Sequence, residues 1–309
     1  LVCSEVVDTL RARALVEADA GSAHAVPRPG PMRVTAAAAL PLVAVPTTLG
    51  TGSERSANAV VDWDGDRVLV SGPALVPALV VHDERATREL PTRLVAAGAF
   101  EALARCLGPL VGSAGTPAAD ELAAAVAGRI AVLGDRCGDP AARSDEHTWA
   151  SIRTELARLS ALGHTAALHA GRSPFAFAPW YVGHELATCT GQDKVSVLAR
   201  LLPAVWSELL SGEIGWGDPA RLRTAWEVVG TARGVGSSDP VTGLLELVEQ
   251  WGLSTDGWVP IDRDALTRRI MRRWSDGIPH LAAVPEPAVR RVVGLAAVRR
   301  TVDASQRAG

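Results

Sequence analysis

The chain has 309 residues, of which 48% are hydrophobic and 21% charged, and its formal net charge is −3. This composition is typical of a folded globular protein and excludes extended disorder, while the near-neutral charge argues against nucleic-acid binding. No uninterrupted run of 18 apolar residues occurs, so we expect no membrane span. The four cysteines are scattered, which favours reduced thiols and a cytoplasmic location.

Residues 1–85 have the pattern of a small α/β region. Residues 5–19 show helical spacing of apolar side chains. Short apolar runs punctuated by glycine and proline predict strands at Leu40–Val45, Val60–Val61, Val68–Val70 and Leu79–Val81. We expect the first of these strands to be buried, and we expect Asp62–Asp66 to form a hairpin turn.

From residue 86 onward the pattern is helical. Between Thr92 and Val111, apolar residues recur at three- and four-residue spacing. Further helices are predicted at residues 118–133, 146–170, 178–190, 194–211, 218–231, 239–252, 262–274 and 286–301. The predicted fold class is therefore α/β plus all-α, with a small α/β part over residues 1–85 and a larger helical domain over residues 86–309.

One loop carries a specific motif. Pro46–Glu54 reads PTTLGTGSE and resembles the PTTxGTGSE signature of the iron-containing alcohol dehydrogenase family, with all eight specified residues matched. Ala74–Leu103 resembles the segment that follows in the family, and Gly183–Pro203 resembles its later histidine region. The resemblance implies that the α/β part is a reduced or truncated Rossmann-like unit. It also implies a site in the cleft between the two parts.

The chemistry of this loop suits a cofactor. Its hydroxyls and glycine backbone can approach a phosphate or ribose, although a tight polar turn is the alternative interpretation. The resemblance implies NAD or NADP, and it assigns to cofactor binding Thr47, Thr48, Thr51, Ser53, Asn58, Arg67 and Leu94. For Arg67, a solvated charge in a hairpin remains an open alternative.

The N-terminal segment departs from the family pattern. Val2–Thr9 stands where the family has a glycine-rich GGGSxxD loop, and here the glycines are absent. Side chains at these positions would obstruct a pyrophosphate, and Glu5 would repel it. Either the sequence is truncated, or this part no longer binds a dinucleotide in the family's manner.

The metal-ligand positions also depart from the family pattern. By resemblance, the aspartate and three histidines that bind the metal correspond to Glu101, Arg105, Trp180 and Lys194. Arginine offers no lone pair and tryptophan is not a metal ligand, so we expect no Fe²⁺ or Zn²⁺. A substitute site built from Glu101, His169, His184 and Asp193 remains an alternative without standard ligand spacing.

The substituted residues suggest two roles. Glu101, Arg105 and Lys194, the only lysine in the chain, could form an ion-pair cluster that fills the vacated cavity. Alternatively, Lys194 or Arg105 replaces the metal in stabilising a carbonyl or alkoxide oxygen. His184 matches a family histidine near the nicotinamide and is predicted to relay protons, or else it is a hydrogen-bonded core residue.

Two functions of different classes follow from the resemblance. The first is NAD(P)-dependent hydride transfer between an alcohol and a carbonyl, without the family metal, on a small-molecule or peptide-borne substrate. Such a protein would act as a homo-oligomer or beside a partner enzyme. The second is a catalytically inactive relative that serves as a binding or scaffold partner in a biosynthetic pathway, for example peptide natural-product tailoring. A gene fragment is a third interpretation.

Overall fold

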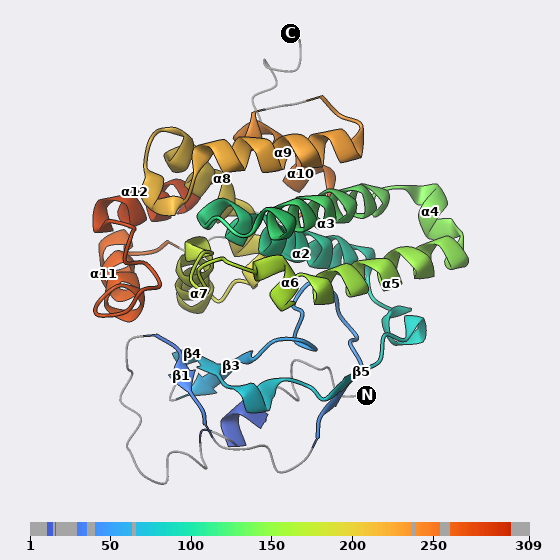
Figure 1. The fold of residues 1–309 in the computed structure, drawn as a ribbon, viewed down its shortest axis with the longest axis horizontal. Helices are drawn as coiled ribbons and strands as arrows, with labels where there is room; N and C mark the ends of the chain where they lie inside the picture. The colour runs from blue at the N-terminus through green and yellow to red at the C-terminus, as the bar shows by residue number, and fades with distance from the viewer. Residues whose placement is uncertain are drawn as a thin grey trace.

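The computed structural model describes residues 11–14, 16, 30–35, 41–63, 66–236, 239–253 and 260–297. Figure 1 shows a large body of packed helices and, beside it, a smaller region of short strands. The predicted fold class, a small α/β part followed by a larger helical part, is confirmed. The predicted boundary between residues 85 and 86 falls within the 3₁₀ helix η3 (Glu84–Thr87).

Five short strands form two small sheets. They are β1 (Met32–Arg33), β2 (Val43–Ala44), β3 (Asn58–Trp63), β4 (Asp66–Ser71) and β5 (Leu79–Val80). In the first sheet β4 lies between β1, to which it is parallel, and β3, to which it is antiparallel. In the second sheet β2 and β5 are parallel. A 3₁₀ helix, η2 (Pro73–Leu75), connects β4 to β5.

The strands predicted at Val60–Val61, Val68–Val70 and Leu79–Val81 correspond to β3, β4 and β5, whereas β1 was not predicted. The predicted hairpin is confirmed, because β3 and β4 pair up to Trp63 and Asp66. The prediction of a buried strand over Leu40–Val45 was wrong in extent, since the strand covers Val43–Ala44, and it holds for burial at Ala44 but not at Val43, which is 53% exposed. Among the described strands, β2 has β5 as its one neighbour, so the sheet leaves one edge of β2 unpaired. Of the helix expected over residues 5–19, residues 11–14 and 16 are described and are helical, while the others lie outside the described residues.

The helical part matches most of the predicted segments. Its helices are α2 (Thr92–Gly112), α3 (Pro117–Arg136), α4 (Pro140–Ser144), α5 (Glu146–Leu162), α6 (Ala166–His169), α7 (Ala178–Thr190), α8 (Lys194–Leu210), α9 (Pro219–Arg233), α10 (Pro240–Gln250), α11 (Arg263–Trp274) and α12 (Glu286–Ala297). A 3₁₀ turn, η4 (Ile214–Trp216), follows α8. Helix α4 was not predicted, and the last four residues of the predicted helix 286–301 all lie outside the described residues.

The single helix predicted over residues 146–170 is in fact two helices. Helix α5 ends at Leu162, and the chain turns through Gly163, His164 and Thr165 before α6 begins. The hydroxyl of Thr165 donates to the carbonyl oxygen of Leu162 at 2.8 Å, which satisfies one of the carbonyls left open at the helix end. This turn places His164 at the edge of the functional cleft described below.

Aspartate caps explain where most of these helices begin. An aspartate side chain accepts a backbone N–H from the first turn of each of six helices, which satisfies donors that the helix itself cannot use. The capping residues are Asp139, Asp145, Asp193, Asp218, Asp239 and Asp262. A proline at the first or second helical position accompanies three of these caps, where its missing N–H costs nothing.

The hydrophobic core is divided between the two parts. The main core lies among the helices, and a smaller cluster lies under the first sheet, formed by Ala12, Val16, Val34, Ala59, Val61, Val70 and Leu75. Helix α2 is long and apolar enough to cross a membrane by length and composition, but 72% of its most apolar window is buried in the fold. It is therefore explained as the central helix of the main core.

Candidate active site

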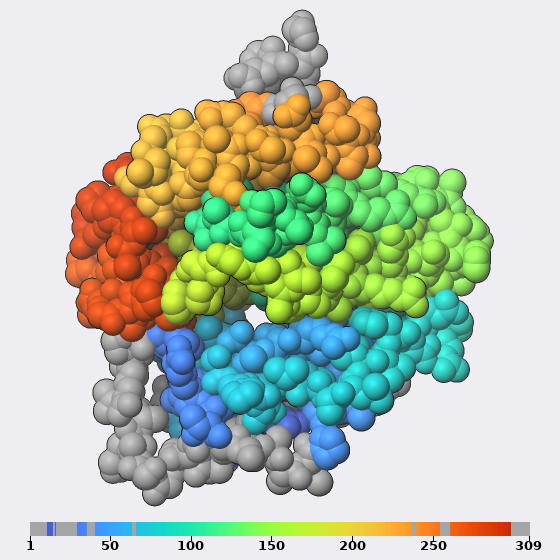
Figure 2. All heavy atoms as spheres, in the orientation of Figure 1, coloured from blue at the N-terminus to red at the C-terminus, as the bar shows by residue number. Residues whose placement is uncertain are grey.

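A cleft of about 950 Å³ separates the α/β part from the helices. Figure 2 shows the hollow between the strand region and the helices above it. Strands β3 and β4 and the loop before them form one side, and helices α2, α7 and α8 form the other. The volume falls in the range of small-molecule and cofactor sites.

The loop Pro46–Glu54 is held tightly against the helical part. Gly50 has a φ of +93°, and a Cβ added to it would lie 2.4 Å from the carbonyl oxygen of Gly98 on α2. Gly52 has a φ of +58°, and a Cβ there would lie 1.9 Å from the ring of His164. Both positions need glycine for conformation and for space. The two glycines therefore fix the loop at the mouth of the cleft.

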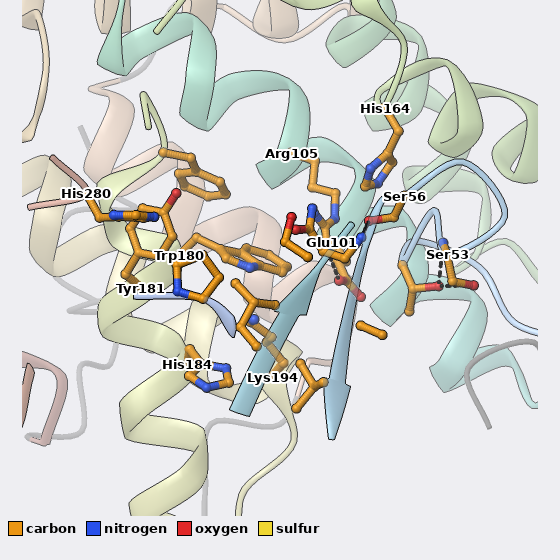
Figure 3. Close-up of a pocket in the computed structure, with 18 of the residues that line it drawn as sticks. Ser53, Ser56, Glu101, Arg105, His164, Trp180, Tyr181, His184, Lys194 and His280 are labelled. Carbon is orange, nitrogen blue, oxygen red and sulfur yellow. Dashed lines mark hydrogen bonds and ion pairs between the residues drawn. The ribbon is translucent and has the colours of Figure 1, made fainter. Parts of the chain in front are cut away.

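Three side chains from three helices meet at one corner of the cleft. The Arg105 guanidinium carbon lies 3.9 Å from the ring centroid of Trp180, and the Lys194 ammonium nitrogen lies 3.6 Å from the same centroid. Arg105 also pairs with Glu101 at 3.2 Å, one helical turn away on α2. Figure 3 shows the Trp180 ring between the two cations. We call Glu101, Arg105, Trp180 and Lys194 the cation cluster.

Local chain geometry places Lys194 at this corner. Helix α7, which carries Trp180, ends at Gly191 in the left-handed conformation, with a φ of +68°. The chain then turns at once into α8, whose first residue is Lys194 and whose cap is Asp193. The first turn of a helix disfavours a cation, because the helix dipole is positive there. The contact with the Trp180 ring face offsets this cost.

Burial shifts the pKa of several groups in and around the cation cluster. Burial lowers the pKa of Arg105, and the carboxylate of Glu101 offsets part of that effect. Burial raises the pKa of Glu54, which is 3% exposed at the end of the loop. His164 has its pKa held well below the ordinary value, chiefly by burial and secondly by the charge of Arg105. It is therefore neutral at physiological pH.

Comparison with known proteins supports a relationship to one enzyme family. Residues 4–84 match the sequence model of the iron-containing alcohol dehydrogenases. A 4-hydroxybutyrate dehydrogenase of Cupriavidus necator is 41% identical over 95 residues, which are 30% of this chain and 25% of that protein. A mitochondrial hydroxyacid-oxoacid transhydrogenase of Homo sapiens is 39% identical over 69 residues, which are 22% of this chain and 15% of that protein.

Solved structures extend the likeness to the whole fold. An NADH-dependent butanol dehydrogenase A of Thermotoga maritima superposes with a TM-score of 0.74 at 19% identity, over 95% of this chain and 73% of that chain. An iron-containing alcohol dehydrogenase of Thermococcus thioreducens gives 0.72 at 16% identity, over 96% and 75%. Residues 4–84 thus resemble the iron-containing alcohol dehydrogenases in sequence, and the chain has the fold of these solved structures. The aligned segments cover a quarter or less of the two curated relatives named above.

The family's metal does not fit the residues present. The cation cluster occupies the positions that the sequence aligns with the metal ligands of iron-containing alcohol dehydrogenases, and two of its four members carry positive charge. Among the described residues, no group of three or more histidine, cysteine, aspartate or glutamate side chains is arranged to hold a metal ion. The alternative site of Glu101, His169, His184 and Asp193 is therefore not formed.

A nicotinamide cofactor fits the cleft better than the metal does. Of the residues assigned to it by resemblance, Thr51, Ser53, Asn58 and Arg67 line the cleft. The hydroxyl of Thr51 lies 3.5 Å from that of Ser53, so two hydroxyls stand side by side at the glycine loop. Thr47, Thr48 and Leu94 are not among the lining residues. Val2–Thr9, the counterpart of the family's pyrophosphate loop, lies outside the described residues. The roles of all seven cofactor-binding candidates remain predictions.

Arg67 satisfies both interpretations that the sequence left open. It lines the cleft from β4, and it also pairs with Asp62 across the hairpin at 3.8 Å, with 44% of its side chain exposed. A surface pair of this kind stabilises the fold little. The cation therefore remains accessible to an anionic group in the cleft.

His184 lies in the cleft wall as a buried, neutral residue. Its Nε2 lies 3.1 Å from the backbone carbonyl oxygen of Arg67, which joins α7 to strand β4. Burial, followed by the charge of Lys194, lowers the pKa of His184 to about 3. A neutral imidazole that donates from Nε2 leaves Nδ1 as an acceptor. The predicted proton relay through His184 would have to use this neutral form.

A buried ion-pair group beside His184 joins the two sides of the cleft. Glu185 is fully buried; it accepts hydrogen bonds from Arg269 and the Trp274 indole and forms an ion pair with Arg273 at 3.3 Å. The two arginines also pair with Asp66 of β4, each at 2.6 Å. Helices α7 and α11 thus hold the β3–β4 hairpin at a fixed distance from the helices.

Several residues of the cleft were not predicted from sequence. His164 sits under Gly52 without a motif to mark it, and among the described residues its Nε2 has no hydrogen-bond partner. Phe175, Phe177, Tyr181 and His280 also line the cleft. Aromatic residues on an apolar helix carry no pattern that separates a cleft wall from a core, so only the three-dimensional arrangement distinguishes them.

Proposed function

We propose that the protein is a nicotinamide-dependent oxidoreductase that interconverts an alcohol and a carbonyl, with the cation cluster in place of the family's metal. The observation that carries this proposal is the position of Lys194 and Arg105 on the Trp180 ring, at the aligned metal-ligand positions and inside the cleft. Bound NAD(P) would supply or accept the hydride.

The chain's own residues would then act on the substrate oxygen. Negative charge develops on that oxygen as a carbonyl is reduced, and a nearby cation would stabilise it. Lys194 offers N–H donors and Arg105 a planar set of N–H groups, which suit one oxygen or a bidentate group. Glu101 keeps Arg105 in place through their 3.2 Å ion pair and is a positioning residue.

The proposed cofactor side of the site uses the glycine loop. Thr51 and Ser53 would donate or accept hydrogen bonds at the ribose, while the positive φ values at Gly50 and Gly52 let the backbone come close. Nδ1 of the neutral His184 would accept a hydrogen bond from a substrate hydroxyl, directly or through water, while the hydroxyl proton passes to solvent. A cytoplasmic location fits the three cysteines of the described residues, which are all free thiols.

The test is a titration of the purified chain with NADH and NADPH, followed by turnover measured with alcohols and aldehydes. Micromolar binding of one nucleotide together with turnover supports the proposal. Nucleotide binding without turnover would leave a cofactor-binding protein and remove catalysis from the account.

A second function is favoured by one specific observation. Arg105 and Lys194 are both engaged with Trp180, so the corner that the metal occupies in a family enzyme is already filled by protein. An inactive relative that serves as a binding or scaffold partner would have this corner filled by side chains, as here, and would bind neither NADH nor NADPH. The same titration separates the two functions, since absence of binding favours the scaffold.

A further inference from the structure

One wall of the cleft is built from aromatic rings. Phe175, Phe177, Trp180, Tyr181 and His280 all line it, and we call these five residues the aromatic wall. Four of them lie within seven residues of sequence, where the chain enters α7, and His280 joins them from the loop after α11. Figure 3 shows His280, Tyr181 and Trp180 on the same side of the cleft.

The composition of the chain makes the gathering of aromatic residues at this cleft informative. The whole sequence contains one tyrosine, three phenylalanines and one lysine. The tyrosine, two of the phenylalanines and the lysine all line this cleft. Residue types that are rare in the chain are therefore gathered at one place.

Burial separates the aromatic wall from the ordinary core. In the described helical part, every other phenylalanine and tryptophan is buried, at 6% exposure or less; they are Phe100, Trp149, Trp206, Trp216, Trp226, Trp251 and Trp274. Phe175, Phe177, Trp180 and Tyr181 are each half-buried. Packing alone would have removed these rings from solvent as it did the others, so part of each ring remains exposed to the cleft, although both cations cover Trp180 and Trp274 covers one face of Tyr181.

The rings are also fixed in position. His280 lies 4.5 Å from Phe175 and 4.7 Å from Tyr181 between ring centroids, and Tyr181 stacks on the buried Trp274 at 4.9 Å. Phe177 lies 5.7 Å from Trp180. These are the offset and edge-on distances at which aromatic groups attract one another, and a further ring can join such an arrangement. Rigid rings lose little entropy when a ligand binds.

We infer that the aromatic wall is a subsite for a flat aromatic ring carried by the substrate. Trp180 belongs both to the wall and to the cation cluster, so the subsite adjoins Lys194, where the proposed function places the substrate oxygen. The protein would thus act on an aromatic alcohol or carbonyl compound. This inference rests on the proposed function for the reaction, although ring binding itself does not require turnover.

Ligand binding without cofactor tests the subsite separately from catalysis. The probes are 2-naphthalenemethanol and its saturated decahydro analogue, which carry the same hydroxyl on similar carbon frames. Calorimetric titration of the full chain should give a Kd about tenfold lower for the naphthalene alcohol, because two or more ring contacts each contribute about three- to tenfold. Equal Kd values, or no binding of either alcohol, would overturn the inference.

Substitutions in the aromatic wall test whether its rings are responsible for binding the naphthalene alcohol. Phe175→Leu and Tyr181→Leu should each weaken binding of the naphthalene alcohol by about three- to tenfold, whereas Tyr181→Phe retains the ring and should bind as the parent chain does. Trp63→Leu removes a half-buried aromatic ring of β3 that is not among the lining residues and serves as the matched control. Thermal unfolding checks that each variant is folded. Binding unchanged in both leucine variants would assign the wall to packing, whether or not the protein turns over a substrate.

Discussion

The ammonium group of Lys194 lies 3.6 Å from the ring centroid of Trp180. These two residues stand at two of the four positions that align with the metal ligands of iron-containing alcohol dehydrogenases, and here they contact each other. In a metal enzyme two such residues would share an ion. Here a cation–π contact joins them, and Arg105 contacts the same ring at 3.9 Å. The aligned ligand positions are therefore occupied by a packed, charged cluster.

Lys194 should matter to catalysis more than to stability. Lys194→Met should lower kcat by about a hundredfold, because it removes one group that stabilises the substrate oxygen. Lys194→Arg keeps the charge and should recover part of the rate. Arg223→Met, which removes an exposed cation on α9, is the control and should leave kcat unchanged. If Lys194→Met turned over as fast as the parent chain, Lys194 would have no part in the reaction.

The glycine loop should tolerate no side chain at Gly50. Gly50→Ala places a Cβ 2.4 Å from the Gly98 carbonyl oxygen at a positive φ, and it should lower the free energy of unfolding by about 3 kcal/mol. Gly191→Ala has the same conformational strain but no atom within 4 Å of the new Cβ, so it should cost about 1 kcal/mol. Urea unfolding measures both. Equal costs would show that the loop moves easily away from α2.

The Gly50→Ala variant should also lose nucleotide binding if the loop holds the cofactor. Fluorescence titration of the folded variant measures this, with Gly191→Ala as the control that binds normally. Retained binding in a displaced loop would remove Thr51 and Ser53 from the cofactor site.

The buried carboxylate of Glu185 should be important for stability. Glu185→Ala removes the carboxylate that accepts from Arg269 and the Trp274 indole and pairs with Arg273, and we expect a loss of about 3 kcal/mol in the free energy of unfolding. Glu286→Ala breaks an exposed ion pair on α12 and should cost less than about 1 kcal/mol. A small effect at Glu185 would mean that Asp66 alone is enough to hold both arginines.

His184 should make stability depend on pH in one direction. Its pKa is lowered to about 3 in the folded chain, against an ordinary value of 6.5. Between these values the unfolded chain binds more protons, so the contribution of His184 to stability is lost as pH falls below about 6. His184→Gln can keep the hydrogen bond to the Arg67 carbonyl but does not titrate. Below pH 6, the free energy of unfolding of the parent chain should therefore fall relative to that of His184→Gln by about 1.4 kcal/mol for each pH unit. A difference that stays constant from pH 7 to pH 4 would show that His184 is not held neutral.

The sequence predicted the helical part well because its helices are long, strongly periodic and bounded by aspartate, proline and glycine. It failed where a helix broke at Gly163 and His164, since a single glycine inside an apolar pattern does not by itself mark a turn. Four of the five described strands were located, but β1 was not, and the exposure of β2 was not predicted. Burial of a two-residue strand depends on neighbours that sequence patterns do not show.

The site was predictable where a motif fixed it. The alignment of Glu101, Arg105, Trp180 and Lys194 came from family spacing, and the structure places these four side chains together. The aromatic wall and His164 were not predictable, because their proximity depends on how the turn after α5 and the loop after α11 fold back on α7. The orientation of a side chain toward a cleft or a core is a tertiary property.

The most direct test of the account measures nucleotide binding and metal content on the same sample. NADH and NADPH are titrated by fluorescence, and iron and zinc are quantified by elemental analysis after purification in the presence of both metals. The account predicts micromolar binding of one nucleotide with less than about a tenth of an equivalent of metal, since the cation cluster leaves no ligand set. A full equivalent of iron or zinc would contradict it.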